Sequence, residues 1–259
     1  MVAPAGLQEA FDNANSEDDL LVAPGTLTAS PENDSNNVLF FENKPISVEC
    51  SDRSGSACII DGQSVRSALR IFDTLGKLTT LSYFTLQNGD PLTTASGGGI
   101  YLYQAIVRLV VVTLKDNAVS DSGDGGGIGT YQTNTLTMVG CKFSGNTATG
   151  TGNDGPDIYW DYGTATVSGC PVGYAQTQES ALEISNKFGG TITSPAYSFA
   201  CAICDAGKSS TAGAASCSIT CPSGHFASRF LHVLSRGEKF FRERGNVDRV
   251  VHTLYRWEI

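Results

Sequence analysis

The sequence predicts an all-β protein: a right-handed parallel β-helix with a short N-terminal capping helix and a small C-terminal cysteine-rich module. Three observations support this fold. Two independent sequence markers recur every 28 to 30 residues, apolar and polar residues alternate between them, and glycine-rich turns separate the segments. Alternation of this kind indicates strands rather than helices. The 29 glycines and the low charged fraction of 17% also fit a turn-rich β protein.

An amphipathic helix is expected within the N-terminal lead-in, residues 1–18. Apolar residues recur there at the i, i+3, i+4, i+7 spacing of one helical face, namely Leu7, Ala10, Phe11 and Ala14. The first coil of a solenoid has unpaired edge strands, which would otherwise pair with other chains. We therefore expect the helix to cover that end.

Residues 19–172 are expected to form about five coils. The marker GGGI stands at Gly97–Ile100 and returns 28 residues later at Gly125–Ile128, and a weaker copy ends at Ile158. A second series, out of phase, spaces its apolar anchors by 28 and 29 residues: Leu86, Leu114 and Phe143. A unit without a helical segment cannot bury its own apolar face, so such units stack, with strands about 4.8 Å apart. The alternative is a β-sandwich with coincidental glycine loops.

Three segments follow the predicted β-helix. Residues 173–200 form a transition, residues 201–225 a cysteine-rich module, and residues 226–259 a basic tail of unassigned role with seven Arg or Lys against four Asp or Glu. The far end of the solenoid also needs cover, and the nearest candidate is Cys170–Phe188. Within it, four residues are expected over the last coil: Ala181, Leu182, Ile184 and Phe188.

The eight cysteines are an even number, which favours disulfides and an oxidising compartment. Four of them follow the spacing C-x2-C-x12-C-x3-C, namely Cys201, Cys204, Cys217 and Cys221. Two such pairs can also supply four thiolates to zinc. The residues between them are small, polar and glycine-bearing, which favours disulfides. We predict two local disulfides within this module and a further bridge between Cys50 and Cys58.

Charge and hydropathy exclude several classes of partner. The formal net charge of −9 lacks the basic footprint of a nucleic-acid-binding protein. No stretch approaches 18 consecutive apolar residues, so no transmembrane segment is expected in this chain. An acidic surface rich in Gly, Thr and Asn points to an extracellular or cell-surface protein.

At the repeats the sequence resembles a known family. GGGI together with an F-x-x-N element, here Phe143–Asn146, is similar to the repeat of polymorphic outer-membrane proteins and related β-helix proteins of the pectin-lyase-like fold. The motifs APGTLTA, CIIDGQ, FTLQNGD and GGGIYL match the order that leads into such a helix, and the resemblance covers residues 5–172. Leu114–Asn117 departs from the motif by having Leu for Phe. The cysteine module resembles the ephrin-receptor-like repeats of large eukaryotic surface proteins.

Pectin-lyase-like folds include polysaccharide lyases and glycoside hydrolases, so the resemblance raises catalysis as an alternative. Glycoside hydrolysis needs two carboxylates about 5 to 9.5 Å apart. The nearest candidates are the turn acids Asp116, Asp121, Asp124, Asp154, Asp157 and Asp161. The repeat region lacks histidine and the paired-Asp, Gly-His-Gly and Arg-x-Lys motifs, so we assign no catalytic residue and expect solvated carboxylates. No cofactor is expected, although Asp121 and Asp124 with turn carbonyls can form a weak Ca²⁺ site.

Aromatic residues near the glycine turns can stack on sugar rings, or instead complete a ladder or a cap: Tyr101, Tyr103, Tyr131, Tyr159 and Trp160. The leading hypothesis is therefore a non-catalytic extracellular scaffold for binding or adhesion, with carbohydrate or cell-surface proteins as partners. A carbohydrate-active enzyme on the same fold is one alternative. A structural spacer within a larger surface protein is the other.

Overall fold

The computed structural model describes residues 1–3, 6–28, 36–74, 76–91, 96–120, 123–149, 155–186, 190–193 and 197–220. They all belong to one structural unit, Met1–Ala227. The basic tail predicted for residues 226–259 lies outside the described residues.

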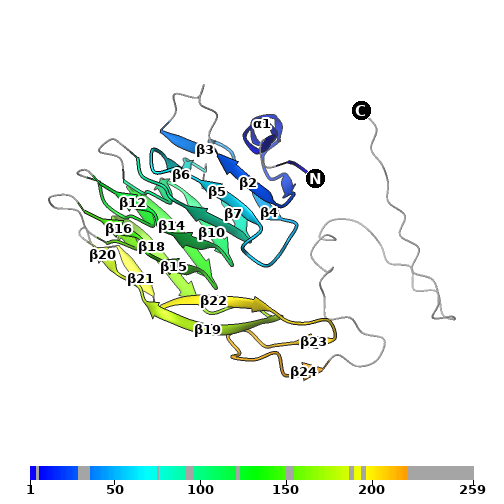
Figure 1. Cartoon of the computed structure of the whole chain (residues 1–259). Coiled ribbons are helices and arrows are strands. Elements are labelled where there is room, and N and C mark those ends of the chain that lie inside the picture. The colour runs from blue at the N-terminus through cyan, green and yellow to red at the C-terminus, as the bar shows by residue number, and fades with distance from the viewer. Residues whose placement is uncertain are drawn as a thin grey trace. The chain divides into compact units, whose positions relative to one another are not determined.

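Parallel strands wind into a solenoid of about five coils, which confirms the predicted parallel β-helix (Figure 1). The first two coils contain β1 (Asp19–Val22), β2 (Gly25–Thr28), β3 (Asn37–Glu42), β4 (Ser47–Cys50), β5 (Cys58–Asp61) and β6 (Ser67–Phe72). The third and fourth contain β7 (Leu78–Ser82), β8 (Phe84–Gln87), β9 (Ile100–Tyr103), β10 (Ile106–Val110), β11 (Thr113–Lys115), β12 (Ala118–Val119) and β13 (Ile128–Tyr131). The fifth contains β14 (Thr133–Val139), β15 (Lys142–Ser144), β16 (Thr147–Ala148) and β17 (Ile158–Trp160).

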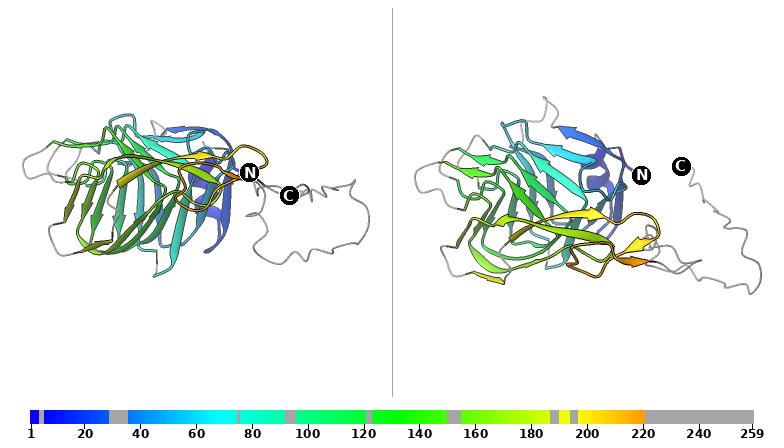
Figure 2. Two further views of the ribbon diagram at one scale, coloured as in Figure 1. Left: turned by 90° about the horizontal axis from the view of Figure 1, so that it is seen from below. Right: turned by 60° about the horizontal axis from the view of Figure 1, so that its bottom comes forward.

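Three parallel sheets form the faces of the solenoid, because each strand pairs with its counterpart in the next coil. Sheet A has the order β1-β4-β7-β10-β14-β18-β21, where β18 spans Tyr162–Ser168 and β21 spans Thr191–Thr193. Sheet B has the order β2-β5-β8-β11-β15, and sheet C the order β3-β6-β9-β13-β17-β20, where β20 spans Ile184–Asn186. Figure 2 shows these strands side by side from two further directions.

Both sequence markers are columns of this stack. Ile128 of the GGGI marker pairs with Ile100 in the preceding coil and with Ile158 in the next. Leu114 of the second marker pairs in the same way, with Leu86 and Phe143. The predicted period is therefore the length of one coil. It lengthens between the second and third coils, where Ser47 pairs with Thr80, 33 residues later.

The core consists of the inward side chains of all three sheets. The central residues of each column are at most 3% exposed: Val48, Leu81, Leu109, Met138 and Val167 in sheet A, Ile60, Leu86, Leu114 and Phe143 in sheet B, and Leu69, Ile100, Ile128 and Ile158 in sheet C. Full burial of each such side chain stabilises the fold by roughly 1.5 to 3 kcal/mol. Stacking therefore supplies the apolar burial that a single coil lacks.

The GGG marker stands where backbones approach too closely for side chains. A Cβ at Gly98 would lie 2.3 Å from the carbonyl oxygen of Ala118 and 2.7 Å from that of Gly126. Both obstacles are main-chain atoms of the next coil, the first of them in β12, and neither can rotate away. Gly97 also has a φ of +78°, which favours glycine.

The N-terminal helix α1 (Leu7–Asn13) covers the first coil, as predicted. Leu7 and Phe11 are 1% and 3% exposed, and the ring of Phe11 stacks on that of Phe41 with centroids 4.4 Å apart. Gln8 reaches the edge strand β3: its Nε2 donates to the carbonyl of Phe40 at 2.9 Å, and its Oε1 accepts from the Phe40 N–H at 2.8 Å. The Gln8 side-chain amide thus satisfies both backbone hydrogen-bonding groups of Phe40, which face away from β6 at the sheet edge.

The C-terminal end adds a partial layer and two antiparallel hairpins. Strands β18, β20 and β21 continue sheets A and C, while β19 (Tyr174–Ala181) pairs with β22 (Tyr197–Ile203), and β23 (Lys208–Ser209) with β24 (Ile219–Thr220). Leu182 is buried and Ile184 pairs with Ile158, so both lie on the last coil as expected. Ala181 is exposed instead, because it ends a hairpin strand, and Phe188 lies outside the described residues.

Disulfides link Cys50 to Cys58, Cys170 to Cys201 and Cys204 to Cys217. The expectation that Cys201 pairs within the module is wrong, because β22 brings it against the solenoid, where its Sγ lies 3.4 Å from the Gly140 carbonyl. With three of its four sulfurs oxidised, the module does not offer four thiolates to zinc. Cys221 lies outside the described residues. Cys141 is a buried thiol, and burial raises its pKa to about 12.

Candidate ligand-binding face

The outer side of sheet C carries aromatic side chains on successive coils. Alternation along β6 turns Leu69 and Ile71 inward, so Arg70 and Phe72 face outward. Register then defines two outward columns: Phe40, Arg70 and Tyr101 in one, and Phe72, Tyr103 and Tyr131 in the other. We call these six residues the aromatic face.

The second column is a stack of rings. The centroids of Phe72 and Tyr103 are 4.1 Å apart with an interplanar angle of 2°, and those of Tyr103 and Tyr131 are 5.8 Å apart at 20°. Rings stacked in this way cover each other's faces and leave mainly their edges to solvent. Tyr131, the last ring of the column, is 53% exposed and offers a ligand the most room.

The guanidinium group of Arg70, in the first column, is surrounded by rings of both columns. The Cζ atom of Arg70 lies 4.8 Å from the ring centroid of Tyr101, 5.0 Å from that of Phe72 and 5.9 Å from that of Phe40. These distances are within the range of cation–π attraction. The Nε of Arg70 is buried without a hydrogen-bond partner.

The phenol of Tyr101 remains protonated in this setting. Burial raises its pKa, and the negative charges of ionised Tyr103, Tyr131 and Asp161 would act in the same direction. Only Arg70 opposes the shift. Tyr101 is therefore a hydrogen-bond donor throughout the neutral pH range.

Amide and carboxylate groups lie at the corner beside the exposed end of the second column. Gln104 Nε2 donates to Gln132 Oε1 at 2.7 Å, and the Gln132 N–H donates to Asp161 Oδ2 at 3.1 Å. The residue Asp161 is 4% exposed, and its Oδ1 has no hydrogen-bond partner. This corner adds polar groups next to Tyr131.

The structure brings together three of the five aromatic residues predicted as ligand contacts, namely Tyr101, Tyr103 and Tyr131. Tyr159 pairs with Gly129 of the preceding coil but is only 6% exposed. Trp160 is fully buried, so the expectation that it contacts a ligand is wrong. Alternation along β17 turns Trp160 inward beside Ile158, and its Nε1 lacks a hydrogen-bond partner.

Sequence reasoning missed Arg70, Phe40 and Phe72. They belong to the first two coils, which precede both repeated markers: Arg70 is 30 residues after Phe40 and 31 before Tyr101, whereas Tyr103 and Tyr131 are 28 apart. The available signal was the alternation in SALRIF, which turns Arg70 and Phe72 to the same outer side.

The acidic candidates have diverse surroundings. Asp116 is half exposed and its Oδ2 lies 3.4 Å from Lys115 Nζ, which fits the expected solvated turn carboxylate. Asp157 contradicts that expectation: it is buried, accepts from Asn146 Nδ2 and from the Glu183 N–H, each at 3.1 Å, and has a pKa raised by burial. Asp161 is buried as well. Both carboxylates accept hydrogen bonds that offset their burial: Asp157 from Asn146 of its own coil and from the Glu183 N–H, and Asp161 from the Gln132 N–H of the preceding coil.

The predicted Ca²⁺ site gains no support within the described residues. Asp121 lies outside them, and Asp124 contributes its main chain to the coil contact, its carbonyl accepting from the Gly97 N–H at 3.0 Å. Asp154, named above among the turn acids, also lies outside the described residues. Among the described residues, no group of three His, Cys, Asp or Glu side chains is arranged to hold a metal ion.

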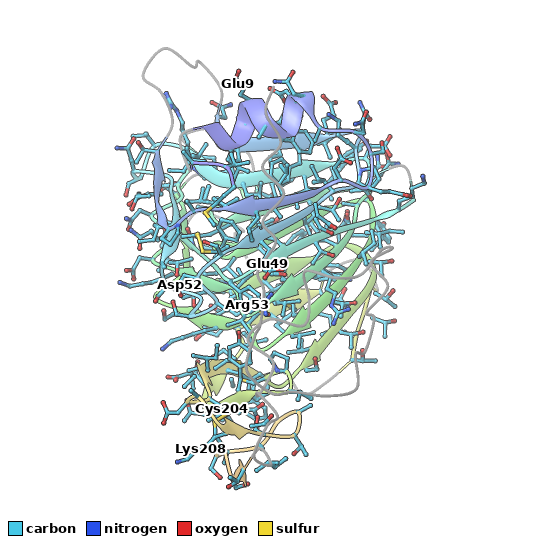
Figure 3. The ribbon with its side chains drawn as sticks, turned by 90° about the vertical axis from the view of Figure 1, so that its right-hand side faces the viewer. Glu9, Glu49, Asp52, Arg53, Cys204 and Lys208 are labelled. Atoms are coloured by element: carbon cyan, nitrogen blue, oxygen red, sulfur yellow. A yellow bond between two sulfur atoms is a disulfide. The ribbon has the colours of Figure 1, made fainter. Side chains whose placement is uncertain are left out.

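A second polar cluster attaches the C-terminal hairpin to the solenoid. The Arg53 guanidinium pairs with Glu49 at 2.8 Å, and the Arg53 carbonyl accepts from the Tyr174 hydroxyl at 3.0 Å. The rings of Tyr174 and Tyr83 stack with centroids 6.1 Å apart. Figure 3 shows Glu49 and Arg53 together on the side of the solenoid, with Cys204 and Lys208 of the module below them. These groups serve a contact within the fold.

No helix in the described part of the chain has the length and hydropathy needed to cross a membrane. A scan against protein-family models and searches of curated proteins and of solved structures find no match to this chain.

Proposed function

We propose that this protein is a non-catalytic scaffold at the cell surface or outside the cell, and that it binds carbohydrate through the aromatic face. The observation that carries the proposal is the column Phe72, Tyr103 and Tyr131, which ends in a ring that is 53% exposed. Stacked aromatic residues on a rigid sheet lose little conformational entropy when they bind a ligand.

The chemistry of the face suits sugars. A tyrosine combines an apolar ring with a hydroxyl, so it can contact both the C–H surface and the hydroxyl groups of a pyranose. Tyr131 offers exposed ring surface, while Gln104 and Gln132 place amide groups at the adjacent corner. A glycan lying along the column would meet such a set on two successive coils, Tyr103 with Gln104 and Tyr131 with Gln132.

The location rests on the disulfides and on the resemblance. Three disulfides are typical of proteins that fold in an oxidising compartment. The likeness of the repeats to polymorphic outer-membrane proteins and the pectin-lyase-like fold, and of the module to ephrin-receptor-like repeats, supports a place at the cell surface. The buried Asp157 and Asp161 accept structural hydrogen bonds within and between coils, which favours a binding role over a hydrolytic one.

Binding to a panel of oligosaccharides, measured by calorimetry, tests the proposal. Tyr131→Ala is expected to weaken binding about tenfold, since one aromatic contact is worth ~1 to 1.5 kcal/mol. Tyr197→Ala is the matched control, because Tyr197 is also exposed, at 39%, but lies on the C-terminal hairpin. Wild-type protein that binds no glycan, or a Tyr131→Ala variant with unchanged affinity, would contradict the proposal. Release of reducing ends from a bound glycan would contradict its non-catalytic part.

A further inference from the structure

We infer that Arg70 is an anion-binding residue and that the ligand of the aromatic face is an acidic saccharide, carrying carboxylate or sulfate groups. This inference rests on the proposed carbohydrate binding and adds the charge of the ligand. It follows from the environment of one guanidinium group, from the lack of a counter-charge and from the donors around it.

The aromatic rings hold Arg70 without using its hydrogen-bond donors. Three rings lie within 6 Å of its Cζ, those of Phe40, Phe72 and Tyr101. Their π systems attract the positive charge but do not replace an oxygen acceptor. A guanidinium carries five N–H donors, and the buried Nε has no partner. The group is therefore fixed in place with donors to spare.

Arg70 also lacks a counter-charge. Within the described residues no carboxylate lies within 4 Å of its guanidinium, whereas Arg53 pairs with Glu49 at 2.8 Å. A half-buried charge without a partner costs folding free energy. A bound anion would remove that cost, and the planar fork of arginine matches carboxylate and sulfate oxygens.

The neighbouring groups add one donor for an anion and three acids whose charge would oppose it. The phenol of Tyr101 stays protonated, so it adds a donor beside the guanidinium. Three acids lie nearby. Glu42, in the preceding coil, pairs with Phe72, and Asp73 follows Phe72 in the chain. Asp161 is near enough to Tyr101 to raise its pKa. Glu42 is exposed, so solvent and salt screen its repulsion.

The test compares acidic saccharides with matched neutral ones. Calorimetry would measure binding of oligogalacturonate against its methyl ester, and of a sulfated galactan oligomer against its unsulfated form. In at least one of these pairs, wild-type protein should bind the acidic member at least ten times more tightly than the neutral member. Arg70→Met should weaken that binding tenfold to hundredfold, as expected for loss of a charge-assisted hydrogen bond, and leave the neutral member unchanged. Arg108→Met, which removes an exposed arginine of sheet A, should change neither.

The outcomes separate the two claims. Equal affinity for acidic and neutral members, unaffected by Arg70→Met, overturns the inference about Arg70 and leaves carbohydrate binding standing. Failure of both members to bind contradicts the proposed function itself. Arg70→Lys keeps the charge without the fork and should show intermediate affinity. If Arg70→Met lowers the thermal midpoint, Arg70→Lys provides the test instead. Full wild-type affinity in Arg70→Lys would overturn the role of the guanidinium fork.

Discussion

The solenoid and the C-terminal hairpins are stabilised in different ways. In the middle of the stack, strands such as β10 and β14 have neighbours on both sides and turn their apolar residues into a shared core, as Leu109 and Met138 do at 0% exposure. In the hairpins, both residues of β24 are exposed and most of β19 is exposed. Apart from the buried Tyr174 and Phe199, the hairpins have little apolar core, and disulfides contribute more of their stability, as in small secreted modules. Stability should therefore be cooperative in the first region and local in the second.

The largest effect should come from a cavity in the middle of the stack. Leu109→Ala removes a fully buried side chain between Leu81 and Met138, and should destabilise the fold by about 2 to 5 kcal/mol. Ile219→Ala in β24, where the side chain is 46% exposed, should change stability by less than about 0.5 kcal/mol. Chemical denaturation followed by circular dichroism measures both. Similar losses in the two variants would abolish the distinction between the regions.

A methyl group added at Gly98 should have the next largest effect. Its Cβ would meet only backbone atoms, the nearest 2.3 Å away, so strands of two coils would have to separate, at roughly 1 to 3 kcal/mol. Gly6→Ala is the matched control, because Gly6 has a φ of −98° and no heavy atom within 4 Å of the added Cβ. Thermal unfolding distinguishes them. An unchanged midpoint for Gly98→Ala would show that the coils have more freedom than the contacts indicate.

Loss of the Cys204–Cys217 disulfide should act on the module alone. The bridge closes a loop of 13 residues, for which the entropic stabilisation is about 3 kcal/mol. In a Cys204→Ser, Cys217→Ser double variant, hydrogen exchange should accelerate at β23 and β24 and remain slow at β10 and β14. Exchange that accelerates equally in all four strands would mean that module and solenoid unfold together.

The smallest effect should be the pH dependence at Asp157, which joins the last full coil to β20. Burial raises its pKa, so the folded state holds the proton more tightly than the unfolded state. Its stabilising contribution is complete below the unfolded-state pKa and is lost as pH rises through the folded-state pKa. Raising the pH from 4 to 7 should therefore lower the unfolding free energy of wild type relative to that of Asp157→Asn. A difference that stays constant over this range would argue against the shift.

The sequence predicted the later coils well because their columns repeat with little variation. Ile100 and Ile128, or Leu86 and Leu114, face one another in the structure at the spacing read from the chain. The first coils have insertions at their corners, so Arg70 and Phe72 could not be aligned with Tyr101 and Tyr103 beforehand. The partner of Cys201 was equally hidden, since Cys170 is 31 residues away and joins it only through the docking of β22.

The aromatic face was only partly predictable, for a different reason. Residue type alone marks Tyr101, Tyr103, Tyr131, Tyr159 and Trp160 as equal candidates, whereas the structure leaves Trp160 fully buried and Tyr131 53% exposed. Alternation within β17 would have turned Trp160 inward with Ile158. The burial of Tyr159 depends on neighbouring chain segments, which no local pattern encodes.

The corner between β4 and β5 shows how such a protein can vary. Seven residues, 51–57, lie between these strands, while Tyr83 alone separates β7 from β8. The Cys50–Cys58 bridge closes this longer corner at its base, with a Cα–Cα distance of 5.9 Å, and the strands on either side keep their pairing. A coil can thus lengthen at a corner without disturbing its strands. Here the added residues have gained a contact of their own, since the Arg53 carbonyl accepts from Tyr174 of the C-terminal hairpin.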